Sequence, residues 1–180
     1  KYLLHYNLGV TCLKNNDFNN AVQCFQEAIR CNPFHASSHM QLGKVMARQQ
    51  LFSRALLSLE TFLALEPSSG RSNEILVYIE NICSNVPDTS MGLFIEPFMD
   101  NTLFDGLDHL IKSKVVLNER YKSLIDFNAN MIRQNQLLFE SLPYNEESVD
   151  FWVQVYLPFF KAIKEGDHIV PFLYTLLRST

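Results

Sequence analysis

A set of residues recurs at a spacing of 34 along the first third of this 180-residue chain, and no other feature restricts its fold as strongly. The recurring pairs are His5 and His39, Leu8 and Leu42, Gly9 and Gly43, Phe18 and Phe52, Ala21 and Ala55, and Pro33 and Pro67. A fixed period of this length is typical of a supersecondary unit that stacks on copies of itself. The sequence therefore predicts a helical repeat array rather than an ordinary globular domain.

Within each unit the spacing predicts two antiparallel helices. Leu8 and Cys12 are four residues apart and share one face of the first helix. Gly9 leaves room for a second helix to cross closely, and Ala21 is the small residue that faces it. Asp17, at the end of the intervening turn, is suited to cap the second helix.

These residues resemble the tetratricopeptide repeat family, whose pattern is W-x2-L-G-x2-Y, then A-x3-F, then P, at a period of 34. The resemblance covers two consecutive units, residues 2–69. The departures are substitutions between packing residues, which leave the predicted fold unchanged. They are His5 and His39 at the Trp position, Cys12 and Met46 at the Tyr position, and Leu59 at the Phe position.

The repeat then decays into a single helix and a boundary. Ile75, Ile79, Ile82 and Val86 predict a capping helix over Glu74–Val86, and the repeat glycine is gone. The segment from Pro87 to Pro97 is irregular, so we divide the chain into repeats and capping helix at 1–87 and a helical C-terminal region, packed on the repeats, at 88–180. No family is recognised in the second part.

The second part is also predicted to be helical, so the fold class is all-α. The expected helices are Leu103–Ile111, Asn118–Leu142, Ser148–Glu165 with a kink at Pro158, and Ile169–Arg178. Neither part contains an alternating strand pattern of any length.

The long helix over 118–142 carries an apolar seam with two asparagines in it. The seam is Tyr121, Leu124, Asn128, Met131, Asn135, Leu138 and Leu142, at alternating spacings of three and four. One interpretation is a coiled-coil dimer whose asparagines set the register. The other is packing within the chain, which the wider apolar stripe added by Ile125, Ile132 and Phe139 favours.

Two polar groups were candidates for chemistry, and we expect neither to provide it. Cys31, His35 and His39 have a helical spacing that could hold zinc, but Pro33 interrupts the helix between them. The segment with Asp105, Asp108 and His109 could supply acid–base groups, although it reads more simply as the solvent face of an amphipathic helix. Phosphate-binding and nucleophile motifs are absent from the sequence. We therefore predict no catalytic residue, no metal, no cofactor and no enzyme activity.

Composition narrows the possible partners. The 15 basic and 19 acidic residues give a net charge of -4, which does not suit a nucleic-acid surface. The longest apolar stretch, Phe151–Ile163, is shorter than the roughly 20 residues of a membrane span. Four cysteines without a C-x-x-C pair favour a reducing compartment, so we expect a cytoplasmic protein. Helical patterns at both ends suggest a fragment of a longer chain, which we expect to be monomeric.

The resemblance implies a non-catalytic adaptor or scaffold that binds a peptide or a partner protein in the concave groove of its repeats. The expected groove residues are Tyr6, Val10, Leu13, Lys14, Met40, Lys44, Ala47 and Arg48, a basic set around an apolar strip. Family members that clamp a chaperone C-terminus use Lys and Asn where this chain has Tyr6 and Val10, so that sub-class is not expected. Two alternatives stay open: a docking arm of a larger enzyme, and a structural homo-oligomer formed through the long helix.

Overall fold

The structure, a computed structural model, describes residues 1–84, 102–117, 129–144 and 148–177, and within them all regular structure is helical. The α-helices are α1 Tyr2–Lys14, α2 Phe18–Cys31, α3 Ala36–Arg48, α4 Phe52–Leu65, α5 Gly70–Cys83, α6 Thr102–Ser113, α7 Asn130–Ser141, α8 Phe151–Val155, α9 Leu157–Glu165 and α10 Ile169–Leu177. A short 3₁₀ helix, η2, follows α6 at Val115–Leu117. The all-α prediction is confirmed.

The helices α1–α2 and α3–α4 form the two expected hairpins, and their glycines mark the close crossings. A Cβ atom on Gly9 would lie 2.7 Å from the Phe25 ring, and one on Gly43 would lie 2.6 Å from Leu59 Cγ. Phe25 and Leu59 are themselves 34 residues apart, so both hairpins cross at the same point of the repeat. The structure thus explains why glycine recurs at this position.

The turns of the hairpins also repeat. Asn16 and its counterpart 34 residues later, Gln50, both have a left-handed backbone, with φ of 58° and 57°. Asp17 caps α2, where its side chain accepts a hydrogen bond from the backbone N–H of Asn20. The predicted cap is therefore present, and the two turns reverse the chain in the same way.

The helix that follows the second hairpin, α5, begins four residues before the predicted start. Ser69 caps it: its hydroxyl accepts from the Ser72 backbone N–H, and the Ser72 hydroxyl accepts from the Ser69 N–H in return. This capping box starts the helix at Gly70. The helix ends at Cys83, because Ser84 has an extended backbone with ψ of 169°, so the prediction that it continues to Val86 was wrong. Residues 85–101 lie outside the described residues, so the proposed boundary between 87 and 88 stays a prediction.

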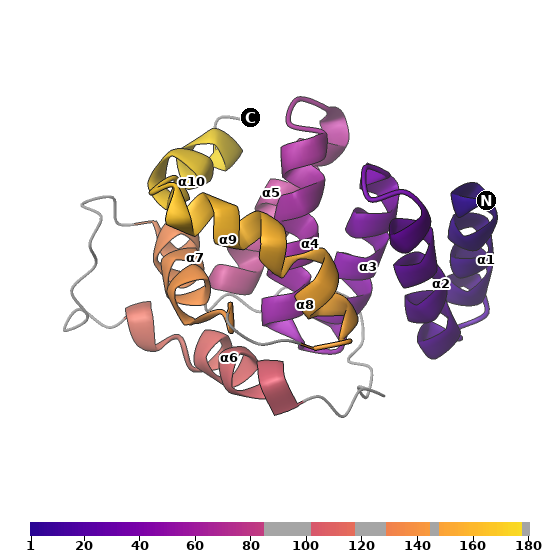
Figure 1. Cartoon of the computed structure of the whole chain (residues 1–180), viewed down its shortest axis with the longest axis horizontal. Helices are drawn as coiled ribbons and strands as arrows, with labels where there is room; N and C mark the ends of the chain where they lie inside the picture. Colours follow the sequence, from indigo (N-terminus) through magenta and orange to yellow (C-terminus); the bar gives the residue numbers. More distant parts are fainter. Residues whose placement is uncertain (85–101, 118–128, 145–147, 178–180) are drawn as a thin grey trace.

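The helices α1 to α5 lie side by side, and the later helices pack against α4 and α5 (Figure 1). In this view α8 and α9 cross in front of α4, while α6 and α7 lie below and beside it. One buried cluster continues from the hairpins through α5 to α10. The C-terminal helices therefore share a core with the repeats.

Two polar contacts fasten the C-terminal helices to the second hairpin. Asp108 accepts hydrogen bonds from the Ser53 N–H and hydroxyl, at 2.7 and 2.6 Å, and pairs with Arg54 at 2.7 Å. His39 contacts the Tyr156 hydroxyl through Nδ1 at 2.9 Å. Asp108 is only 4% exposed, so the expectation that it lies on the solvent face of its helix was wrong. Asp105 and His109, its neighbours in the sequence, are exposed.

The helix expected over 118–142 is not continuous. Ala129 has an extended backbone with ψ of 131°, so α7 begins at Asn130. Residues 118–128, with Tyr121, Leu124 and Asn128 of the seam, lie outside the described residues. The rest of the seam, from Met131 to Leu142, is buried within this chain. That burial favours packing within the chain over a coiled coil.

The predicted kink near Pro158 is present as a break between two helices. The chain turns at Tyr156, and Pro158 lies in the first turn of α9, where its missing N–H leaves no partner unsatisfied. Gly166 and Asp167 separate α9 from α10, as expected. No helix in the described ranges is both long enough and apolar enough to span a bilayer.

Candidate partner-binding groove

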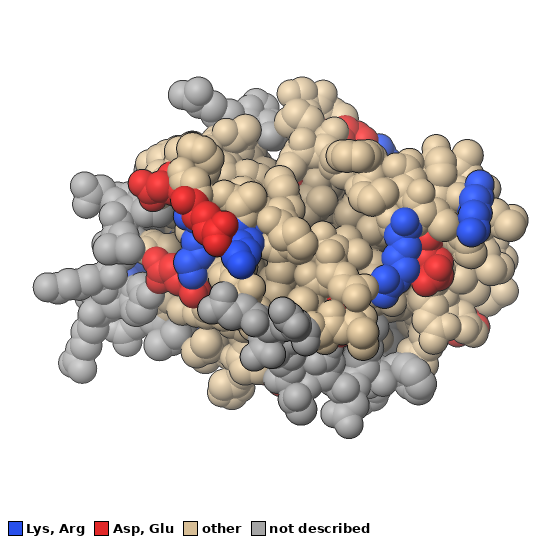
Figure 2. Space-filling model, in the orientation of Figure 1, with Lys and Arg blue, Asp and Glu red and all other residues tan. Residues whose placement is uncertain are grey.

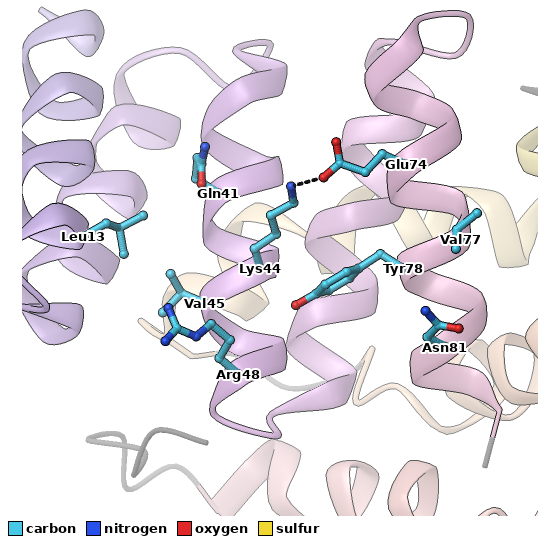
Figure 3. A pocket seen from close by; sticks show the side chains of 9 residues that line it. All are labelled: Leu13, Gln41, Lys44, Val45, Arg48, Glu74, Val77, Tyr78 and Asn81. Atoms are coloured by element: carbon cyan, nitrogen blue, oxygen red, sulfur yellow. Dashed lines mark hydrogen bonds and ion pairs between the residues drawn. The ribbon is translucent and has the colours of Figure 1, made fainter. Parts of the chain in front are cut away.

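A groove with a volume of about 470 Å³ runs between the first helices of the units, α1 and α3, and α5. Its lining residues are Leu13, Gln41, Lys44, Val45, Arg48, Glu74, Val77, Tyr78 and Asn81 (Figure 3). The helices run from α1 on the left to α5 on the right in Figure 3, which reverses their order in Figure 1. The groove therefore opens on the face opposite α8 and α9.

Helical periodicity places these side chains together. The lining residues of α3 and those of α5 each recur at spacings of three and four, which keeps them on one face of their helix. Of the α5 lining residues, only Tyr78 stands 34 residues after a lining residue of α3, Lys44. The counterparts of Gln41, Val45 and Arg48 are Ile75, Ile79 and Ile82, which are buried, so the repeat spacing alone does not identify the α5 side of the groove.

An ion pair crosses the groove between α3 and α5. Lys44 Nζ lies 2.7 Å from Glu74 Oε1, above the Tyr78 ring (Figure 3). The Glu74 side chain is 64% exposed, so solvent screens the pair and its contribution to stability is about 0–1 kcal/mol. The pair nevertheless neutralises one of the two positive charges in the groove.

The other positive charge, Arg48, has no ion-pair partner among the described residues. Its guanidinium carbon lies 4.7 Å from the centre of the Phe18 ring, within the range of a cation–π contact. The Nε atom is buried and lacks a hydrogen-bond acceptor. Arg48 is thus held by packing, and within the described part of the chain no carboxylate forms an ion pair with it.

Of the eight predicted groove residues, only Leu13, Lys44 and Arg48 line this groove. Met40 and Ala47 are 7% and 2% exposed, so they belong to the core. Their burial follows from close stacking of the hairpins, which helical spacing alone does not reveal.

The other three predicted residues lie on α1 but outside the lining. Tyr6 packs against the rings of His35 and Phe25, at centroid distances of 4.9 and 6.0 Å. Val10 is partly buried against the core, and Lys14 is exposed at the end of its helix. The lining residues that sequence reasoning missed are Gln41 and Val45 on α3 and the whole α5 set.

The histidines considered for zinc have other partners. His39 is 1% exposed; its Nε2 donates to the Pro33 carbonyl at 2.8 Å, and its Nδ1 accepts from the Tyr156 hydroxyl. His35 Nδ1 lies 2.7 Å from the Ser38 hydroxyl. Burial lowers the pKa of His39 to about 4, which keeps the ring neutral. Over the described ranges, no three His, Cys, Asp or Glu side chains are grouped as metal ligands.

A second cavity, of about 260 Å³, lies on the opposite face, where α8 and α9 cross α4. Apolar residues dominate its lining, which consists of Pro33, Phe34, His39, Thr61, Ala64, Leu65, Val155, Tyr156 and Phe159. On this face Lys, Arg, Asp and Glu gather in separate groups, with an uncharged area between them (Figure 2). The cavity offers no charged group to select a partner, unlike the groove.

The two hairpins, their glycine crossings and the spacing of 34 define a helical-hairpin repeat structure. The family model described as tetratricopeptide repeat matches residues 2–35, which span α1, α2 and the turn into α3. The chain thus contains a tetratricopeptide repeat segment, and such repeats generally mediate binding between proteins. No curated protein and no solved structure matches the chain.

Proposed function

We propose that this protein is a non-catalytic adaptor that binds a peptide segment of a partner protein in the groove between α1, α3 and α5. The observation that carries the proposal is the groove itself. It has a volume of about 470 Å³, and it combines apolar and charged side chains from three helices, α1, α3 and α5. Stacked helical repeats present binding surfaces of this kind.

The composition of the lining suits an extended or helical peptide. Leu13 and Val77 offer apolar contact above the buried Val45, and Gln41 offers an amide group that can bond to a peptide backbone. Val77 is 63% exposed, which leaves apolar surface available to a partner. Affinity would come mainly from apolar anchors, and the polar groups would set orientation.

The cytoplasm is the compartment that we propose for this adaptor. All four cysteines are free thiols, and Cys83 is buried in the core. Burial raises the pKa of the Cys83 thiol well above its usual value, so it stays protonated and unreactive. Four unpaired cysteines are compatible with a reducing environment.

A selection from a random 12-residue peptide library, displayed on phage, tests the proposal on the whole chain. Val77→Asp places a charge in the groove at an exposed position, so the fold should be kept. Val149→Asp is the matched control, since Val149 is 88% exposed and does not line the groove. Selected peptides should bind Val77→Asp at least about tenfold more weakly than wild type, which corresponds to about 1.4 kcal/mol.

Binding to Val149→Asp should equal wild type, and both variants should keep the wild-type melting temperature. Peptides that bind Val77→Asp as tightly as wild type would place the interaction elsewhere on the molecule. A selection that returns no peptide would contradict peptide binding itself.

A further inference from the structure

The two cations of the groove are not equivalent. Lys44 already has a carboxylate partner in Glu74, at 2.7 Å. Arg48 lies one helical turn further along α3 and has no carboxylate among the described residues. The lining charges of Lys44, Arg48 and Glu74 therefore leave an excess of one positive charge, and that charge is on Arg48.

The guanidinium of Arg48 is also fixed in position before any partner binds. Its contact with the Phe18 ring, at 4.7 Å, restricts the side chain, and its buried Nε is already removed from water. A planar guanidinium binds a carboxylate through two parallel hydrogen bonds. Because the donor is already ordered and partly desolvated, a carboxylate that reaches it loses less free energy to ordering.

The surroundings of Arg48 are apolar on the side toward α1. Leu13 and Val45 line the groove beside it, and Val45 is 2% exposed at the base (Figure 3). A partner side chain on this surface would therefore be aliphatic or aromatic. The distance along α3 between Val45 and Arg48 is three residues, so the apolar and the acidic groups of the partner must be close in its sequence.

We propose that Arg48 selects partner segments in which an Asp or Glu stands beside a bulky apolar residue, with the carboxylate on the guanidinium and the apolar side chain on Leu13 and Val45. This inference rests on the proposed function of the groove. A carboxylate fits better than a phosphate, because it matches the single excess positive charge, whereas a phosphate group carries about -1.5 to -2 charges.

Reversal of the charge at Arg48, in the full 180-residue chain, tests the inference. The probes are the peptides selected from the 12-residue library, each made again with its Asp or Glu replaced by Lys. Arg48→Glu should reduce the affinity for the acidic peptides at least about tenfold, and it should bind the Lys-substituted peptides more tightly than wild type does. Arg48→Lys should recover only part of the affinity, since the ammonium keeps the charge but not the planar pair of donors.

Lys161→Glu is the control, since Lys161 belongs to α9 and does not line the groove. It makes the same charge reversal and should leave every peptide unaffected. Loss of the Phe18 contact could lower stability, so melting temperatures are measured alongside, and Arg48→Gln is included to remove the charge without reversing it.

The outcomes separate this inference from the proposed function. In one outcome the selected peptides bind Val77→Asp more weakly, contain no excess of Asp and Glu, and bind Arg48→Glu as tightly as wild type. This outcome overturns the role of Arg48 and leaves groove binding in place. Peptides that bind both variants normally overturn the two proposals together, as does a library that yields no binder.

Discussion

We expect the free energy of unfolding to decrease as the pH is lowered from 7 to 5, because His39 is buried in its neutral form. The ring is 1% exposed and occupied on both nitrogens, by the Pro33 carbonyl and the Tyr156 hydroxyl. Burial is the main cause of its low pKa of about 4, and the charge of His35 adds to it, while the bond to Pro33 opposes it. In the unfolded chain a histidine has a pKa of about 6.5.

The sign and size of the effect follow from these two pKa values. Below pH 6.5 the unfolded chain takes up a proton that the folded chain refuses until about pH 4, so protons favour unfolding over this interval. A difference of about 2.5 units corresponds to about 3.4 kcal/mol in the free energy of unfolding at pH values below both pKa values. Between pH 7 and pH 5 the loss should be about 2 kcal/mol.

Urea unfolding followed by tryptophan fluorescence measures this loss. The chain has one tryptophan, Trp152, whose ring is stacked on Tyr156 at 5.2 Å, so the signal reports on the same contact. His39→Gln should be less stable than wild type at pH 7 but should lose about 2 kcal/mol less between pH 7 and pH 5. His109→Gln, at an exposed position, is the control and should follow wild type. Equal losses in wild type and His39→Gln would refute the reasoning.

Substitutions at three core positions, with Gly106→Ala as a comparison, are tested by the same urea measurement. Gly43→Ala should lower the free energy of unfolding by about 1–3 kcal/mol, because the added Cβ overlaps the facing helix. Gly106→Ala, with open space around it, should raise the free energy of unfolding by about 0.5–1 kcal/mol. Equal effects of the two substitutions would place the helix crossing elsewhere. Asp108→Asn should cost about 3–5 kcal/mol because the buried charge of Arg54 loses its close partner, and an unchanged midpoint would mean that the pair is open in solution. Burial raises the pKa of the Glu60 carboxyl well above its usual value, so keeping it buried costs stability as the pH rises. Glu60→Gln should therefore stabilise the protein at pH 7 and do so less near pH 4.5. A variant less stable than wild type at pH 7 would contradict this reasoning.

The hairpins were predictable from the sequence because their packing is local and repeated. Gly43 meets Leu59 within one unit, and the same pair of positions recurs 34 residues earlier. The break before α7 was not predictable, because an apolar seam with the right period does not reveal that Ala129 is extended.

Contacts between distant segments were also missed. Asp108 and Ser53 are 55 residues apart, and His39 and Tyr156 are 117 apart. No spacing rule links such residues, so a buried carboxylate and an exposed one look the same in the sequence. The groove residues were predicted only in part for a related reason. Helical periodicity shows which residues share a face of α3, but it does not show that neighbouring helices cover Met40 and Ala47.

The two sides of α3 explain how the C-terminal helices can pack on the repeats without covering the groove residues of this helix. His39, Leu42 and Met46 are buried, and His39 reaches Tyr156. Lys44 and Arg48 lie on the other side of the same helix, because each residue advances about 100° around the axis. The C-terminal helices therefore pack on the side of the hairpin that carries His39. A partner segment bound between α1, α3 and α5 would not compete with them, so substitutions at the groove and at the His39 contact should act independently on binding and on stability.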